Sequence, residues 1–294
     1  SAASAGNTVW VKTGAYAATS ATTTVNNLTL NVESGVTGFT GLILGGSVAS
    51  GTLAGAGAAN LTGNASGNTL TGNDAANVLT PLGGADTVNA AGGDDTVIFQ
   101  APGDSTGDVI DGGSGTNTIL FTSTTAGDSL TLTSTTTNFT IAKIADATGA
   151  TTGTTSLSLD ASAIASGMTL VGNDGANSLK GGAGNDTLTG NAGNDTLEAG
   201  AGTNTIDGGA GTDTAIFGGN YADYTLAFSG ANVVVTRTTG GTSIDTVTNV
   251  EKLQFADKSV YVVGSAVGSA YTAIQPAIDA AAAGDVVMVA AGTY

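Results

Sequence analysis

Oxygen-bearing side chains recur at nine-residue intervals in two parts of the sequence. In the second part they are Asn177, Asp186, Asp195, Asn204 and Asp213, and in the first part Asn68, Asn77, Asp86 and Asp95. Each lies in a glycine-rich turn, where the missing Cβ lets the chain expose its carbonyl groups. Carboxylate, amide and carbonyl oxygens are ligands that hard cations prefer. The chemistry that this pattern favours is therefore cation binding.

The composition argues against most other chemistry. The net charge is −17, from 23 acidic and 6 basic residues, so phosphate recognition and a nucleic-acid partner are disfavoured. The chain has no His and no Cys, and Arg237 is its single arginine, so the commonest general base and the thiol nucleophile are missing. Glu33 and Glu198 are isolated in the sequence, which gives no support for a glycosidase pair. We therefore predict that the protein is not an enzyme.

For three further residues, a structural interpretation is favoured over a functional one. Trp10 falls in a strand-like stretch, which favours a packing or edge role over a sugar platform. Glu251 and Lys252 are neighbours in the chain, and neighbours on a strand point to opposite faces. We expect both of these side chains to stay solvated.

The nine-residue interval extends to whole segments and indicates a repeat architecture. From Gly181 the chain runs GGAGNDTLT, GNAGNDTLE, AGAGTNTID and GGAGTDTAI. One apolar position recurs in the same frame in both parts, at Leu61, Leu70, Leu79, Val88, Val97, Leu170, Leu179, Leu188, Leu197 and Ile206. Glycine turns followed by one apolar residue between threonines predict short strands with a thin core.

These segments resemble the repeats-in-toxin (RTX) nonapeptide, G-G-x-G-x-D-x-U-x. The resemblance implies a parallel β-roll in which two nonapeptides make one coil, residues eighteen apart stack, and Ca²⁺ lies between stacked turns. The ligands it implies are Asp186, Asp195, Asp213, Asn204, Asn177, Gly182, Gly184, Gly193, Gly209, Gly211, Asp86 and Asp95. Asp195 and Asp213 form the best-supported pair. Where Asn replaces Asp, as in GNASGN and GNDGAN, the turn could instead hold itself together by Asn side-chain hydrogen bonds without metal.

The two ends of the sequence resemble each other. Residues 279–294 match residues 1–16 at an offset of 278, with Val287 aligned to Val9 and Val289 to Val11. Residues 271–294 also resemble the entrance of right-handed parallel β-helices of the pectate-lyase type, where a short helix caps the first coil. Ile274, Ala277, Ile278 and Ala281 would form the apolar face of that helix. The match predicts one period of a longer array, in which neighbouring copies stack head to tail.

We predict an all-β, parallel β-solenoid, a right-handed β-helix plus RTX β-roll, with one short capping helix near the C-terminus. The expected parts are β-helix turns over 1–53, a first roll block over 54–120, an irregular connector over 121–165, a second roll block over 166–217, a β segment over 218–263 that resembles those following RTX blocks, and the capping helix and first strand of the next repeat over 264–294.

The function that these expectations favour is structural. We expect a calcium-stabilised repeat unit of a secreted bacterial surface or matrix protein, in a fibre, sheath or S-layer-like assembly. The alternatives are the stalk of a giant RTX adhesin and a non-catalytic module of a secreted polysaccharide-modifying enzyme. No apolar stretch approaches the ~20 residues that span a bilayer, so membrane insertion is not expected.

Overall fold

A computed structural model describes residues 8–12, 14–24, 26–241, 243–264 and 273–291. Its regular structure is almost entirely parallel β-strands wound into a solenoid, which confirms the predicted fold class. The chain divides into two compact units. Unit 1 holds the described residues up to Ser123 together with Leu130–Ala142, and unit 2 holds Thr124–Ser129 together with the described residues from Lys143.

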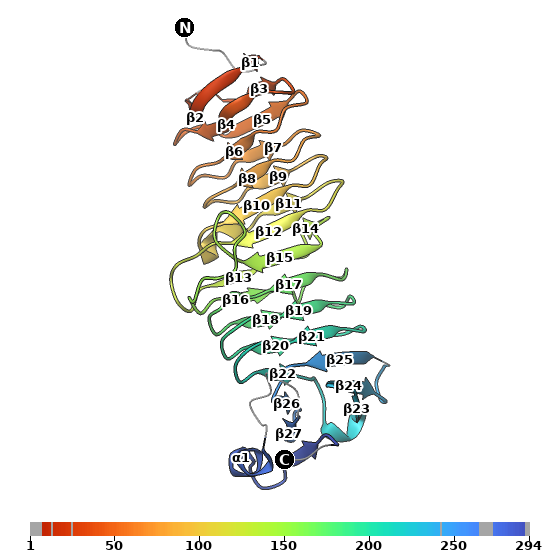
Figure 1. Ribbon diagram of the computed structural model, residues 1–294. Helices are drawn as coiled ribbons and strands as arrows, with labels where there is room; N and C mark the ends of the chain where they lie inside the picture. Colours follow the sequence, from red (N-terminus) through yellow and green to blue (C-terminus); the bar gives the residue numbers. More distant parts are fainter. Residues whose placement is uncertain (1–7, 13, 25, 242, 265–272, 292–294) are drawn as a thin grey trace. The chain divides into compact units, whose positions relative to one another are not determined.

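Unit 1 consists of two parallel stacks of strands (Figure 1). One stack contains β1 (Thr8–Val11), β3 (Leu28–Val32), β5 (Ser50–Ala54), β7 (Thr69–Thr71), β9 (Thr87–Asn89), β11 (Val109–Asp111) and β14 (Thr136–Thr137). The other contains β2 (Ala15–Thr23), β4 (Thr37–Leu44), β6 (Asn60–Thr62), β8 (Val78–Thr80), β10 (Thr96–Phe99) and β12 (Thr118–Phe121). A 3₁₀ turn, Pro102–Ser105, interrupts the winding between β10 and β11. Two strands, β13 (Ser129–Thr131) and β15 (Ile141–Ile144), include the residues at which the chain passes between the units.

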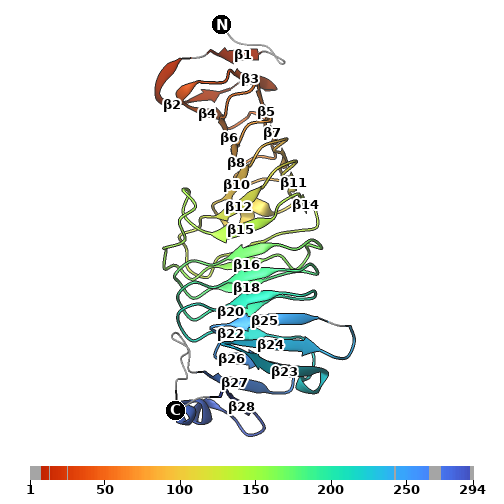
Figure 2. The same ribbon diagram turned by 45° about the vertical axis from the view of Figure 1, so that its right-hand side comes forward.

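Unit 2 is built from the same kind of coil, with antiparallel pairs among its later strands (Figure 2). One stack contains β16 (Ser158–Asp160), β18 (Ser178–Lys180), β20 (Thr196–Glu198), β22 (Thr214–Ile216), β26 (Lys252–Gln254), β27 (Ser259–Val263) and β28 (Val286–Val289). The other contains β17 (Thr169–Val171), β19 (Thr187–Thr189), β21 (Thr205–Asp207), β25 (Ile244–Thr248), β24 (Asn232–Arg237) and β23 (Tyr224–Ser229). Strands β23, β24 and β25 pair antiparallel, so the segment after the second block leaves the coil pattern.

The strand register follows from the nine-residue period. Leu188 pairs with Leu170 on one side and with Ile206 on the other, so residues eighteen apart are stacked, as predicted. Each three-residue strand points one side chain inward, because successive residues alternate between the two faces. All ten residues at the predicted apolar position are at most 1% exposed. Burying one such side chain is worth about 1.5–3 kcal/mol, and the repeat multiplies that gain along the ladder.

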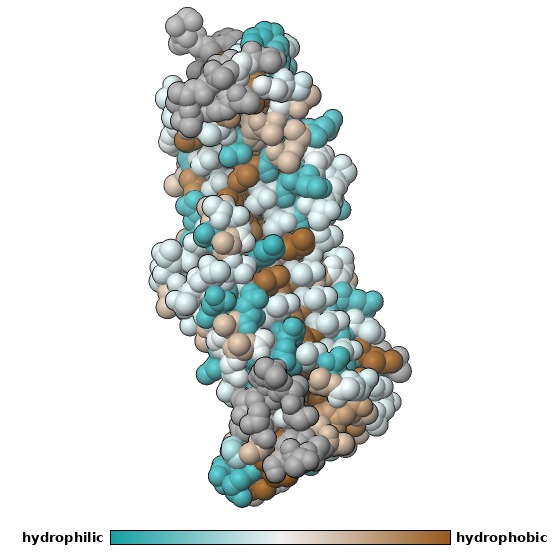
Figure 3. All heavy atoms as spheres, viewed as in Figure 1, coloured by the Kyte–Doolittle hydropathy of each residue, from teal (hydrophilic) through white to brown (hydrophobic). Residues whose placement is uncertain are grey.

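The predicted capping helix is α1 (Ile274–Ala280), but it packs through its small residues. Ala277 is fully buried against Tyr261 and Val263, whereas Ile274 and Ile278 are 38% and 50% exposed. The predicted apolar face is therefore only partly used, because the helix lies close against β27 and β28. No helix in the described ranges is both long and apolar enough to cross a membrane. On the face seen in Figure 3, hydrophobic residues form small separate groups among hydrophilic and intermediate ones.

Candidate metal centre

The Asp and Asn side chains at the turns form stacked columns. We number the nine positions of each repeat so that Asp186, Asp195 and Asp213 occupy position six. In five stacked pairs, one oxygen of the position-six side chain accepts a hydrogen bond from the main-chain N–H of its counterpart one coil earlier. Asp195 N–H donates to Asp213 Oδ1 (2.7 Å) and Asp186 N–H to Asn204 Oδ1 (2.8 Å). The bonds of Asn177 to Asp195 (2.7 Å), Asn68 to Asp86 (2.6 Å) and Asn77 to Asp95 (2.8 Å) repeat this geometry.

The second carboxylate oxygen has no hydrogen-bond partner at four of these positions. Oδ2 of Asp86, Asp95, Asp195 and Asp213 is buried without a donor, although each side chain is at most 1% exposed. Burial of such an oxygen costs free energy unless a proton or a cation reaches it. Accordingly, burial raises the pKa of Asp86 and of Asp213 to about 7, and the pKa of Asp95 and of Asp195 to about 6.

Main-chain carbonyls lie beside these unpartnered oxygens. A Cβ atom added at Gly190 would meet both Oδ2 of Asp195 and the carbonyl oxygen of Gly208. A Cβ at Gly208 would likewise meet Oδ2 of Asp213 and a carbonyl oxygen, that of Asn249. Only glycine leaves this space open, and the carboxylate and carbonyl oxygens that border it are all hydrogen-bond acceptors.

This donor set fits calcium. The described residues contain no cluster of three or more Asp, Glu, His or Cys side chains placed to hold a metal, so carboxylates alone would not complete a site. Calcium takes six to eight oxygen ligands and accepts main-chain carbonyls among them. Asp195 and Asp213, with the carbonyls of the glycine turns, supply oxygens of both kinds, and a bound ion would neutralise the buried carboxylates.

The other predicted ligands have different surroundings. Gly193, Gly209 and Gly211 adopt φ values of 111°, 94° and 148°, whereas Gly182 and Gly184 lie outside the positive-φ region. Both oxygens of Asp186 are bonded, Oδ1 by Met168 N–H (2.7 Å) and Oδ2 by Gly182 N–H (2.9 Å).

The two predicted amide ligands, Asn177 and Asn204, form hydrogen bonds through both the oxygen and the nitrogen of the side-chain amide. Asn177 accepts from Asn173 N–H (2.7 Å) and donates to the Leu157 carbonyl (3.3 Å). Asn204 donates its amide to Asp245 Oδ1 (2.8 Å). A metal role for Asp186, Asn177 and Asn204 stays a prediction.

Three acidic side chains outside the repeats extend the columns, and they were not predicted from the sequence. Main-chain N–H groups of Asp86, Asn204 and Asp213 donate to Asp108 (2.7 Å), Asp245 (3.0 Å) and Glu251 (2.7 Å), respectively. Oδ2 of Asp108 is also buried and unpartnered, and burial raises the pKa of Asp108 to about 6.

The prediction that Glu251 is solvated was wrong, since this side chain is only 1% exposed. Its neighbour Val250 is also buried, so the alternation of faces breaks down at this point. The reason lies in the main chain, because the N–H groups of both Glu251 and Lys252 donate to the Asp213 carbonyl. Lys252 itself is partly buried.

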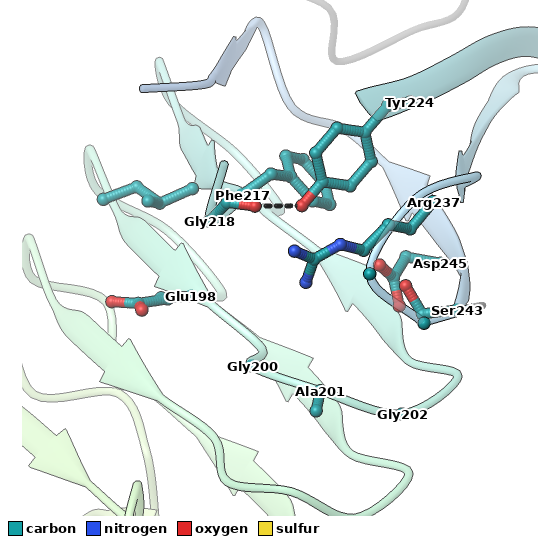
Figure 4. Close-up of a pocket in the computed structure, with 13 residues that line it drawn as sticks. Glu198, Gly200, Ala201, Gly202, Phe217, Gly218, Tyr224, Arg237, Ser243 and Asp245 are labelled. Carbon is teal, nitrogen blue, oxygen red and sulfur yellow. Dashed lines mark hydrogen bonds between the residues drawn. The ribbon is translucent and has the colours of Figure 1, made fainter. Parts of the chain in front are cut away.

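A cavity of about 230 Å³ lies beside the turn of Gly200 and Gly202 (Figure 4). The Arg237 side chain projects into it, with Tyr224 and Asp245 on either side and Glu198 across from it. The Arg237 guanidinium lies over the Tyr224 ring, 5.8 Å from its centroid, and its Nε donates to the Thr239 carbonyl (2.9 Å). The Tyr224 hydroxyl donates to the Gly218 carbonyl. The Arg237 contacts lie within the antiparallel segment, and the Tyr224 bond joins that segment to the chain just after β22.

Comparison with known families agrees with the turn geometry. The model of the RTX calcium-binding nonapeptide repeat matches four times, over residues 54–87, 62–97, 169–197 and 181–215. A search of curated proteins finds no match. The matched residues include Asp86, Asp95, Asp195 and Asp213, the four repeat acids whose buried oxygens have no partner. Residues 54–97 and 169–215 thus carry RTX calcium-binding nonapeptide repeats, and these two blocks form an RTX β-roll whose cofactor is Ca²⁺.

Proposed function

We propose that this chain is a calcium-stabilised structural repeat unit of a secreted bacterial surface or extracellular-matrix protein. The observation that carries the proposal is the set of buried, unpartnered oxygens on Asp86, Asp95, Asp195 and Asp213. A fold built around such oxygens is at a disadvantage where calcium is scarce and is stabilised outside the cell, where calcium modules bind at about 10⁻⁴–10⁻³ M. RTX repeat proteins are typically secreted bacterial proteins, and their repeats are typically non-catalytic.

Head-to-tail stacking of copies is supported by the apolar residues at two terminal strands. Val9 and Trp10 on β1 are 44% and 55% exposed, and Val289 on β28 is 38% exposed. Strand β1 pairs only with β3, and β28 only with β27, among the described strands, so each has one open edge. Open strand edges pair readily with other strands. Because residues 279–294 resemble residues 1–16, β1 of one copy is a suitable neighbour for β28 of another copy.

Calcium should convert the chain into a more stable β-structure. At tenfold excess over its dissociation constant, each ion adds about 1.4 kcal/mol, so ions at four turns would add roughly 5–6 kcal/mol. Circular dichroism during a calcium titration should show a gain of β signal and a higher urea midpoint, and chelator should reverse both. A spectrum and a midpoint that do not respond to calcium would remove the basis of the proposed function.

Blocking either end should prevent assembly without disturbing the fold. We expect Trp10→Lys and Val289→Lys each to abolish the elongated assemblies that light scattering detects in calcium, because a charge would enter the contact between copies. Val109→Lys is the matched control, since Val109 on β11 is 49% exposed but is not at an end. Assembly that persists in both end variants would exclude stacking through β1 and β28.

A further inference from the structure

The repeat turns adopt two main-chain conformations, apart from 54–62, where only Gly55 at position two has positive φ. In six turns the residues at positions two and four both have positive φ, and we call these the open turns, 81–89, 90–98, 112–120, 190–198, 199–207 and 208–216. In four turns neither position has positive φ, and we call these the closed turns, 63–71, 72–80, 172–180 and 181–189. The open conformation does not depend on glycine, because Leu82 (67°) and Ala91 (76°) adopt it at position two. Positive φ is costly for such residues.

The two conformations treat the position-six side chain differently. In every closed turn the N–H of position two donates to that side chain, from Asn64 to Asn68 (2.7 Å), Asn73 to Asn77 (2.9 Å), Asn173 to Asn177 (2.7 Å) and Gly182 to Asp186 (2.9 Å). The four open turns with Asp at position six are those of Asp86, Asp95, Asp195 and Asp213, where Oδ2 has no partner. An open turn with Asp at position six thus leaves one buried carboxylate oxygen without a donor. In a closed turn, the N–H of position two donates to the position-six side chain.

In three closed turns, Asn amides also bind the carbonyls of the previous coil. Asn73 Nδ2 donates to the carbonyls of Gly55 (3.1 Å) and Gly57 (2.9 Å), and Asn77 Nδ2 donates to that of Ala59 (2.9 Å). Asn64 Nδ2 binds the carbonyls of Gly45 and Val48, both at 2.8 Å. Asn173 Nδ2 binds the Thr155 carbonyl (3.0 Å). All these Asn side chains are at most 7% exposed, so their N–H groups lie where water does not compete.

Turn carbonyls are acceptors that a cation would otherwise satisfy. An amide NH₂ group presents two donors with partial positive charge to the same oxygens. We propose that the amides of Asn64, Asn73 and Asn173 take the place of a calcium ion in their turns, whereas calcium binds at the open turns with Asp at position six. This inference rests on calcium binding by those open turns. In each roll block the metal-independent turns, 63–80 or 172–180, then precede the metal-dependent ones.

A gain-of-site variant tests the proposal. Asn173→Gly combined with Asn177→Asp converts GNDGAN into GGDGAD and removes both amides. We expect the full chain to bind one additional calcium ion, counted by native mass spectrometry and calorimetry. The matched control is Asn191→Gly, at position two of an open turn. The Asn191 amide also donates to a carbonyl of the previous coil, that of Gly172 (2.7 Å), but Oδ2 of Asp195 in the same turn has no partner, so the number of ions should be unchanged. A folded double variant that binds the same number of ions as the original chain would overturn the proposal.

Hydrogen exchange of the unmodified chain gives a second test that needs no variant. After calcium removal, amides in residues 63–80 and 172–180 should keep their protection, while those in residues 190–216 should exchange at least about tenfold faster. Equal loss of protection in both sets would overturn the inference while leaving the calcium-stabilised function intact. Failure of the proposed function would differ, because no part of the chain would then respond to calcium.

Discussion

Calcium-free protein should become more stable as the pH falls from 8 to 5. Burial raises the pKa of Asp86 and Asp213 from 3.8 to about 7, and that of Asp95 and Asp195 to about 6. A carboxyl whose pKa is higher in the folded chain than in the unfolded chain favours folding below the unfolded value. It loses that contribution as the pH rises through the folded value. Each tenfold change in a protonation equilibrium is worth about 1.4 kcal/mol, so the four groups together account for several kcal/mol.

The measurement is the urea midpoint at pH 5, 6, 7 and 8 in protein exhaustively freed of calcium. Asp213→Asn should reduce the dependence on pH, because it removes one of the groups that titrate near pH 7. The exposed Asp74, at position three of a closed turn, provides the control, and Asp74→Asn should leave the slope unchanged. In saturating calcium the trend should reverse, since protons and calcium compete for the same oxygens. A calcium-free chain that is less stable at pH 5 than at pH 8 would contradict the assignment.

The strands and the core could be predicted from the sequence because one constraint repeats. A three-residue strand has one inward position, so a period of nine places Leu170, Leu188 and Ile206 in a single buried ladder. The eighteen-residue stacking of the position-six side chains follows from the same period. Local propensity, turn glycines and apolar spacing all agree here, which is the condition under which a sequence predicts its own fold.

The conformation of each turn could not be predicted from the nonapeptide alone. Asp186 and Asp195 occupy the same position of near-identical repeats, GGAGND and GNAGND, yet only Asp195 has an unpartnered oxygen. The difference depends on φ at position two, because Asn191 has a φ of 77° whereas Gly182 lies outside the positive-φ region. Glycine tolerates both signs of φ, so its presence does not decide between them.

The acids that extend the columns could not be predicted from the repeat period, because inserted residues separate them from their column neighbours. Asp108 follows its column neighbour by 22 residues, Glu251 by 38 and Asp245 by 41. A search at intervals of nine or eighteen does not reach them. The structure identifies these acids, because each accepts a hydrogen bond from the main-chain N–H of a repeat residue in the coil before it.

Asp195→Asn should change stability in opposite directions with and without calcium. Oδ1 of Asp195 accepts from Asn177 N–H, and its buried Oδ2 has no donor. An amide of the same shape keeps the first bond, removes the buried charge and offers an N–H toward the Gly208 carbonyl. Without calcium at pH 8 we therefore expect the variant to be more stable by about 1–3 kcal/mol.

In saturating calcium the same change should be destabilising, because a neutral amide oxygen replaces a carboxylate ligand. At tenfold calcium excess over the dissociation constant, the variant lacks about 1.4 kcal/mol of stabilisation from the ion that it does not bind. This deficit grows as the calcium concentration rises and offsets the stability that the variant gains without calcium. Urea midpoints of the two proteins, plotted against free calcium, should therefore cross. Asp74→Asn should give a curve parallel to that of the unmodified chain. A variant that is more stable at every calcium concentration would show that Asp195 holds no ion. One that is less stable at every concentration would show that its buried oxygen is already satisfied.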